Sequence, residues 1–384
     1  MRWITLLLTL LYLPLQAIET SGYFKTFPTH RSPNAAEGTT NSIDNILRLK
    51  ASKQFNKKLR GEIAYELFPL IRKNSPPPPS PIQRPQPQSY RVVDLKSNVF
   101  TTDDDFFLLQ NLDRLFFNYS TEKIDVNVGR QLIAFGSARS INPTDIFTPF
   151  TFDTLNKEDR IGVDAIHITI PTGELTAIEA GFVAGNHFST KQSGAFLTKR
   201  NHVKETDITT SIMYFRKNIL LGVDIQRPIK QAGFWLEMAY VIAESFQTNI
   251  YGNNYFRTTT GLDYKASDKL YIYGEYHFNG PGTITAHDYI VNSNQVAYTQ
   301  GTTYLLGQHY LIPGMMYEIT PLILFNAQLL TNITDPSAYL YAIVEHNIKE
   351  DWYYDYGLLL AIGNPRSEFK LYPDVVYLSV RKYF

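Results

Sequence analysis

The feature that most constrains the fold of this chain is the alternation of apolar and polar side chains with a period of two residues, typical of β-strands. The clearest example begins at Tyr255. One face of it carries Phe256, Thr258, Thr260, Leu262 and Tyr264, and the other carries Arg257, Thr259, Asp263 and Lys265. After a turn at 266–269, the apolar side continues with Leu270, Ile272, Tyr276 and Phe278, and the polar side includes Glu275 and His277. This pattern predicts a β-hairpin with one apolar face, turned either outward to lipid or inward to a soluble core.

Strand length and repetition separate these two alternatives. About seventeen candidate strands of roughly ten residues follow one another, which is the length of tilted membrane strands and about twice that of most soluble ones. They lie near residues 20–27, 43–55, 58–70, 108–119, 123–133, 160–170, 174–184, 206–217, 219–228, 232–243, 255–266, 269–279, 303–318, 321–332, 336–348, 351–362 and 373–384. Bacterial barrels have an even number of strands, so one more is expected within 185–205 or 91–100. The predicted fold is all-β, a transmembrane antiparallel β-barrel of 16–18 strands, with 18 favoured.

Composition agrees with this fold. Aromatic residues make up 14% of the chain, with 26 Tyr and 24 Phe, as suits long strands and rings at a membrane–water interface. No stretch after residue 17 approaches 18 consecutive apolar residues, which argues against spanning helices. Only a closed sheet would then satisfy every backbone group in lipid. Lys plus Arg equals Asp plus Glu, 36 against 36, so the charge indicates no nucleic-acid partner.

The first residues predict export. Arg2 is followed by an apolar run from Ile4 to Leu13, and Ala17 supplies a small residue for cleavage, so residues 1–17 are expected to be a signal peptide. Residues 18–384 then form the barrel. The chain has no cysteine, so an exported form carries no disulfide or thiol chemistry. The expected location is the outer membrane of a Gram-negative bacterium.

Connections between the expected strands alternate between short and long, as in barrels with periplasmic turns and longer outer loops. One long connection is the proline-rich segment 71–90, which predicts a semi-rigid outer loop, with a domain linker as the alternative. The chain ends in an alternating strand whose last residue is Phe384. This ending is typical of a signal for the barrel-assembly machinery, which is therefore an expected partner, together with outer-membrane lipid.

Charged side chains fall on the polar faces of the expected strands, where they would point into the lumen because charges facing lipid are costly. They are Arg48, Lys50, Glu62, Glu66, Asp224, Glu237, Arg257, Asp263, Lys265, Glu275, Glu318, Glu345, Asp355 and Arg381. Such charges would either line a water-filled pore or neutralise one another. A barrel of 16 to 18 strands is too wide for side chains to fill, which favours a pore.

Residues 128–164 carry a distinct motif. A strand ends in Gly129-Arg130-Gln131, a loop follows with Phe135-Gly136 and Asn142-Pro143-Thr144-Asp145, and the next strand opens with Gly162-Val163-Asp164. This segment resembles outer-membrane porins of the alginate-export type, although Phe135 stands where that family pattern has Trp. The resemblance implies a passive channel.

The loop at 136–159 within this motif is long and irregular, which in compact proteins usually marks a functional loop. We expect it to fold into the lumen and constrict the channel, with a plain surface loop as the alternative. Arg130, on the strand before this loop, falls on the same face as the apolar Val126 and Val128. It is therefore expected either to be turned inward by a bulge at Gly129 or to lie at the aqueous rim of the barrel. The residues expected to line the constriction are Arg130, Arg139, Asp145, Arg160, Asp164, Arg257, Asp263, Lys265 and Glu275.

The sequence therefore predicts passive diffusion of small hydrophilic solutes such as saccharides or organic acids. The alternatives are a barrel enzyme and a structural or adhesive barrel. No nucleophile with a His partner, metal-binding pattern or phosphate loop is present, so no catalytic residue, metal or cofactor is assigned. Solute identity, ion selectivity and assembly into homo-oligomers are left open.

Overall fold

The computed structural model describes residues 18–33, 38–73, 90–94, 97–102, 105–149, 151–152, 154–156, 158–244, 254–299 and 303–384. The expected signal peptide at 1–17 and most of the proline-rich segment 71–90 lie outside these residues. The described strands are β1 (Glu19–Arg31), β2 (Thr40–Asn56), β3 (Leu59–Lys73), β4 (Ser97–Thr102), β5 (Phe106–Ser120), β6 (Asp125–Gln131), β7 (Val163–Gly173), β8 (Thr176–Val183), β9 (Gly194–Val203), β10 (Thr206–Phe215), β11 (Asn218–Ile229), β12 (Ala232–Ile242), β13 (Tyr255–Lys265), β14 (Leu270–Asn279), β15 (His309–Thr320), β16 (Ile323–Asn332), β17 (Ser337–Lys349), β18 (Trp352–Ile362) and β19 (Val375–Tyr383).

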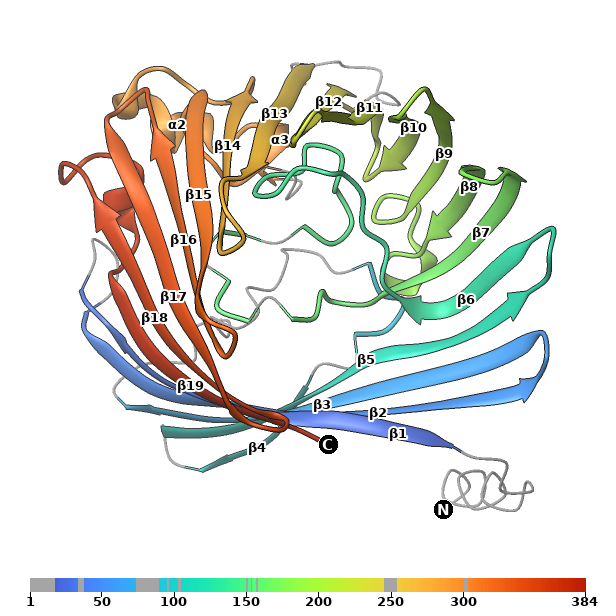
Figure 1. Ribbon diagram of the computed structural model, residues 1–384, viewed down its shortest axis with the longest axis horizontal. Coiled ribbons are helices and arrows are strands. Elements are labelled where there is room, and N and C mark those ends of the chain that lie inside the picture. The colour runs from blue at the N-terminus through green and yellow to red at the C-terminus, as the bar shows by residue number, and fades with distance from the viewer. Residues whose placement is uncertain are drawn as a thin grey trace.

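The sheet closes on itself to form a barrel (Figure 1). Each strand pairs antiparallel with its neighbours, and β1 pairs with β19 from Tyr23–Tyr383 to Arg31–Val375. Short β4 pairs with the end of β5 that also pairs with β3, so it lies beside a ring of 18 strands. The prediction of an all-β barrel with 18 strands is confirmed. The strand expected within 185–205 is β9, and β4 occupies the other expected position.

The two ends of the barrel differ. At the end that holds the starts of β1 and of every second strand, connections are short, as at 57–58, 204–205, 230–231 and 350–351. Lys204 and Glu205 both have positive φ, of 46° and 62°, as a two-residue hairpin turn of type I′ requires. We call this the turn end. Long connections, including 132–162, 280–308 and 363–374, emerge at the opposite end, which we call the loop end.

The outside of the barrel is apolar. Large apolar side chains are exposed on nearly every strand, among them Phe24, Leu49, Ile63, Phe117, Ile166, Leu197, Ile212, Leu221, Leu262, Ile272, Leu311, Tyr356 and Val376. The intervening residues point inward and include buried charges such as Arg48, Glu66, Glu237 and Glu275. A soluble protein has the reverse arrangement, since water favours a polar exterior.

Among the described residues, the helices are single turns in the loops, namely η3 (Asn186–Phe188), η4 (Ala286–Asp288), α2 (Tyr289–Asn292), α3 (Val296–Thr299) and η5 (Phe369–Leu371). No helix among the described residues is long and apolar enough to cross a membrane.

Candidate channel constriction

The connection between β6 and β7, residues 132–162, lies inside the ring (Figure 1). We call it the inward loop. Its side chains join two apolar clusters that also include inward-facing wall residues. One cluster contains Ile133, Ile146 and Phe147, and the other contains Ile141 and Leu155. Burial of these side chains explains how an irregular segment keeps a fixed position inside a wide barrel.

Glu237 on β12 holds the first half of the inward loop. Its side chain is fully buried, and its carboxylate accepts hydrogen bonds from the Thr144 amide at 2.7 Å, the Thr144 hydroxyl at 2.6 Å, Asn142 Nδ2 at 3.1 Å and the Ala138 amide at 3.3 Å. Gly136 has a φ of 91°, and a Cβ there would lie 2.5 Å from both Glu237 carboxylate oxygens. The Asn-Pro-Thr-Asp turn therefore forms around a carboxylate of the wall.

This anchor supplies a stability prediction. Glu237→Gln keeps the shape of the side chain but replaces one accepting oxygen with a donor that faces other donors. We expect the free energy of unfolding to fall by about 1–3 kcal/mol, the usual cost of buried polar groups left without partners. Urea unfolding of the folded barrel would measure it. Glu318→Gln is the matched control, because the Glu318 side chain is only partly buried and forms no ion pair or hydrogen bond with the described residues of the inward loop. Equal stability of the two variants would contradict the proposed anchor.

Arg139 joins the inward loop to β13 and β14. Its guanidinium lies 3.0 Å from Asp263 and 5.2 Å from the ring centre of Trp235, and its backbone N–H donates to Glu275 at 2.5 Å. Its side chain is 51% exposed, so it presents a positive charge to the lumen. Hydrogen bonding to Asp263 raises the pKa of Arg139 despite its partial burial. Of the expected site residues, Arg139, Asp263 and Glu275 are thus brought together.

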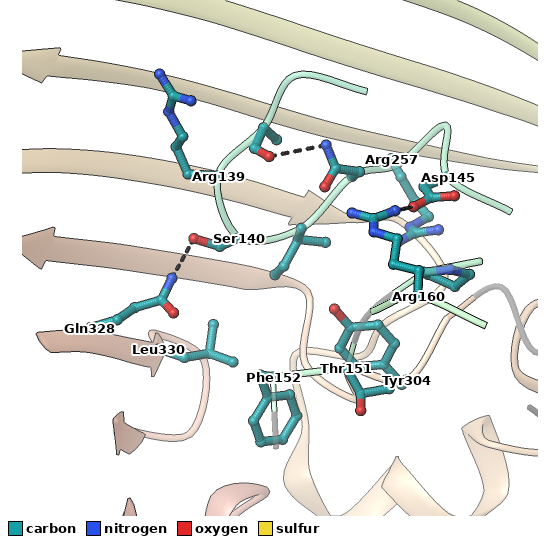
Figure 2. A pocket seen from close by; sticks show the side chains of 14 residues that line it. Arg139, Ser140, Asp145, Thr151, Phe152, Arg160, Arg257, Tyr304, Gln328 and Leu330 are labelled. Atoms are coloured by element: carbon teal, nitrogen blue, oxygen red, sulfur yellow. Dashed lines mark hydrogen bonds and ion pairs between the residues drawn. The ribbon is translucent and has the colours of Figure 1, made fainter. Parts of the chain in front are cut away.

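Asp145, Arg160 and Arg257 form a second group around a small cavity of about 130 Å³ between the inward loop and the wall (Figure 2). Arg160 pairs with Asp145, which is 1% exposed, and Arg257 of β13 borders the same cavity. Burial raises the pKa of Asp145 to about 6, although Arg160 opposes the shift. Phe152, Tyr304 and Leu330 line the other side of the cavity.

Arg130 and Asp164 lie at the base of the inward loop, not at its tip. The guanidinium of Arg130 donates to both carboxylate oxygens of Asp164, at 2.7 Å and 3.0 Å, and to the Leu112 and Val93 carbonyls. Arg130 is buried, and Gly129 before it has a φ of 122°, so of the two placements considered from the sequence the inward one holds. Lys265, two residues after Asp263 on β13, pairs with Asp268 in the following turn.

Glu158 and Asp159, which the sequence did not single out, hold the far end of the inward loop. Glu158 pairs with Lys25 of β1 at 2.8 Å and Arg381 of β19 at 2.5 Å, and Asp159 accepts from the Tyr23 hydroxyl at 2.9 Å. Burial would raise the pKa of Glu158, but Lys25 and Arg381 outweigh it and hold the pKa below its ordinary value. The inward loop therefore contacts β1 and β19 through Glu158 and Asp159, and β12 to β14 through residues 138–144.

Residues 90–94 form a second inward segment that the sequence analysis missed. Asp164 accepts from the Val92 amide at 2.8 Å and donates its own amide to the Tyr90 carbonyl at 2.9 Å. The Tyr90 ring is buried between Phe147, at 5.1 Å, and the Arg216 guanidinium, at 4.9 Å. This segment packs beside the inward loop and fills part of the lumen next to β7 and β10.

Among the described residues, no group of three or more His, Cys, Asp and Glu side chains could hold a metal ion. His277, which shares a strand face with Glu275, is instead buried and hydrogen-bonded to Thr259 at 2.8 Å.

No protein-family model and no curated protein matches the sequence. The structure is similar to that of a double variant of OccD1 (OprD), with a TM-score of 0.56 at 8% identity over 96% of each chain. It is also similar to OccAB1 of Acinetobacter baumannii, with a TM-score of 0.56 at 9% identity over 96% of this chain and 97% of that one. OccAB4 of the same organism gives 0.57 at 9% identity over 97% and 100% of the two chains. The chain therefore shares the 18-stranded barrel fold of these outer-membrane porins.

Proposed function

We propose that this protein is a porin-like channel in the outer membrane of a Gram-negative bacterium, through which small hydrophilic solutes diffuse passively. The observation that carries the proposal is the reversed distribution of side chains, with apolar residues outside the ring and paired charges inside it. An apolar exterior fits lipid, and a charged interior fits water. The similar structures belong to outer-membrane porins, which supports the same function.

The inward loop is proposed to set the size limit of the channel. An empty ring of 18 strands would be wide enough for unselective flow, so a structure inside it must provide selectivity. The half-exposed Arg139 beside Asp263 places opposite charges at the surface of the inward loop, where they would orient polar solutes. Saccharides and organic acids are the proposed solutes.

Single-channel recording in a planar bilayer tests the proposal. Purified barrel should give stable conductance steps, and liposomes that contain it should swell in solutions of small sugars faster than in solutions of large ones. A barrel enzyme would instead hydrolyse a substrate without conducting, and an adhesive barrel would do neither. If protein that is shown to be folded by its heat-modifiability on gels gives no conductance steps, the proposed channel function is contradicted.

The remaining expectations are carried as parts of this proposal. They are cleavage of residues 1–17, recognition by the barrel-assembly machinery, an alginate-export-like character and association into homo-oligomers. The turn end is proposed to face the periplasm, and the loop end to face the outside.

This orientation gives a second prediction. Because the chain has no cysteine, single cysteines can report topology. We expect an impermeant thiol reagent added to intact cells to modify Ser293→Cys, in the 280–308 loop, and to spare Ser267→Cys, in the turn at 266–269. The same reagent should reach both residues after lysis. Modification of Ser267→Cys alone in intact cells would show that the orientation is inverted.

A further inference from the structure

The outer face of the barrel wall carries positive charge near the turn end. Four cationic side chains interrupt the apolar outward faces of their strands, namely Lys53 of β2, Lys199 of β9, Arg227 of β11 and Lys382 of β19. Each of these strands runs from the loop end to the turn end, and each cation lies in the second half of its strand. We call these four residues the outward cations.

Exposed neighbours on the same strands show that the outward cations face away from the lumen. Residues two apart on a strand share a face of the sheet. The exposed apolar residues that share a face with the outward cations are Leu49 and Phe55 on β2, Leu197 and Val203 on β9, Leu221 and Ile229 on β11, and Val376 and Leu378 on β19. The outward cations therefore lie on the surface that we assign to lipid.

These outward faces hold no compensating acid. On β2, β9, β11 and β19, which the structure describes in full, the other outward side chains are all uncharged. Lys382 pairs with Asp351 in the adjoining turn at 3.2 Å. Lys53, Lys199 and Arg227 form no ion pair with any residue that the structure describes. Their positive charges are thus left for a ligand outside the protein.

The positions of the outward cations along their strands correspond to the level of the lipid headgroups. Lys382 lies beside the turn at 350–351, and the other three lie three to five residues before their own turns. With a rise of about 3.3 Å per residue and a tilt of about 40°, all four lie within about 13 Å of the turn end, measured along the barrel axis. A cation at this level costs little, because its long side chain can extend the charge toward water.

Two of the outward cations also lie over aromatic rings. The ammonium nitrogen of Lys53 is 5.8 Å from the centre of the Phe55 ring, and that of Lys382 is 5.9 Å from the centre of the Trp352 ring. Aromatic rings are concentrated at the membrane–water interfaces of barrels. These two contacts therefore support the same placement, at the boundary between acyl chains and headgroups.

We propose that the outward cations bind the phosphate groups of anionic glycerophospholipids, such as phosphatidylglycerol, in the leaflet at the turn end. The phosphate of such a lipid carries a negative charge that no headgroup cation balances, so it complements unpaired lysine and arginine side chains. The exposed apolar residues beside the outward cations would contact the acyl chains of the same lipids. The inference rests on the proposed membrane location and orientation, and it is independent of solute flow.

Lipopolysaccharide also carries phosphate groups, but the distribution of charge favours a phospholipid. In the proposed orientation, lipopolysaccharide lies in the leaflet at the loop end. In the loop-end halves of β2, β9, β11 and β19, the outward side chains are all uncharged. The outward cations therefore lie in the opposite leaflet, which consists of glycerophospholipid.

Spin-labelled lipids test the proposal on the intact barrel. In a phosphatidylcholine bilayer, electron paramagnetic resonance separates lipids held against the protein from free lipids, and so gives a relative association constant for each headgroup. At low salt, spin-labelled phosphatidylglycerol should associate about 1.5- to twofold more strongly than spin-labelled phosphatidylcholine, averaged over the wall, because each cation favours an adjacent anionic lipid about fivefold. Salt at about 1 M should remove the preference by screening. Equal association of the two lipids at low salt would overturn the proposal.

A pair of fourfold variants assigns the preference to the outer face. Replacement of all four outward cations by Gln should abolish the preference and leave conductance unchanged, because these side chains lie outside the lumen. The matched control removes the same charge from inward-facing positions near the turn end and should keep the preference. Its substitutions are Lys50→Gln, Arg60→Gln, Arg200→Gln and Lys265→Gln. A preference that persists without the outward cations, or that both variants lose equally, would overturn the proposal.

A local reporter decides the case even if a fourfold variant does not fold. Phe55→Trp in a Trp352→Phe background places an indole ring beside Lys53 on the outer face, while Trp235 stays buried in the lumen. Quenching by phosphatidylglycerol with brominated acyl chains should show a local fraction about threefold above the bulk fraction. Addition of Lys53→Gln should return it to the bulk fraction, and addition of Lys50→Gln should not. A local fraction equal to the bulk fraction in the reporter itself would contradict the proposed binding.

The lipid site and the channel can fail separately. A barrel that prefers phosphatidylglycerol but never conducts would support the lipid site and contradict the channel. A conducting barrel without the preference would do the reverse. Modification of Ser267→Cys alone in intact cells would place the outward cations in the lipopolysaccharide leaflet, and the assignment to glycerophospholipid would then be wrong.

Discussion

Replacement of residues 133–161 by a short Gly-Ser linker should raise single-channel conductance several-fold and admit larger solutes. The substitution is geometrically simple because Gln131 already pairs with Val163 across β6 and β7, so the two ends of the deletion are adjacent. Residues 90–94 still fill part of the lumen beside β7 and β10, but the rest of a ring of 18 strands is wide enough for free flow of water and ions. Planar-bilayer conductance and liposome swelling with sugars of increasing size would measure the change.

The same deletion should also lower the free energy of unfolding of the barrel. A loop that packs against the wall contributes to this stability, whereas a loop on the outer surface would not. Glu237 would lose all four donors from the inward loop, and Lys25 and Arg381 would lose Glu158. Addition of Glu237→Gln to the shortened protein should therefore cost little further stability, because its partners are already absent. Wild-type conductance in a shortened protein that is folded would show that the inward loop does not limit flow.

Replacement of Phe384 by Asp should reduce the amount of folded barrel in the membrane by about tenfold or more, by far the largest effect we expect from a single residue on assembly. The Phe384 amide donates to the Gly22 carbonyl at 3.0 Å and its carbonyl accepts from the Gly22 amide at 2.9 Å, so it closes the seam between β19 and β1. Its side chain is 57% exposed on the outer face, where a carboxylate would meet lipid.

Phe384→Tyr is the matched control and should assemble normally, since it keeps an aromatic ring at the same place. Heat-modifiability on gels and the amount in isolated outer membranes would report assembly. The few Phe384→Asp barrels that do fold should conduct like the wild type, because the side chain lies outside the lumen. Equal amounts of folded Asp and Tyr variants would contradict a role for this residue in assembly.

The alternation of side chains predicted most of the wall, because each strand is exposed to lipid on one face and to the lumen on the other. The exception is β9: one more strand was expected within 185–205 or 91–100, but the pattern of side chains did not give its position or bounds. The C-terminal half of β9 contains Lys199-Arg200-Asn201-His202. Polar residues therefore occupy both faces of the strand there, and the alternation with a period of two residues disappears. Only its pairing with β8 and β10 identifies it as a strand.

The site was predicted in part. Arg139, Asp145 and Arg160 could be expected from the length and turn chemistry of their loop. Their partners could not, because the contact between Glu158 and both Lys25 and Arg381 depends on which wall strands face one another after closure. The same holds for Tyr90, whose environment comes from segments far apart in the chain.

The contacts of the inward loop have a mechanical consequence. Residues 138–144 and Glu158 of this loop are fixed to strands on nearly opposite sides of the ring, since β12 is ten strands from β1 in one direction and eight in the other. An empty barrel wall flattens readily under lateral pressure from the membrane, but a wall braced across its diameter by the inward loop keeps that diameter fixed. The barrel wall can then flex only at right angles to the inward loop. The two parts of the wall that lie on either side of this loop would deform together as the surrounding bilayer stretches or thins.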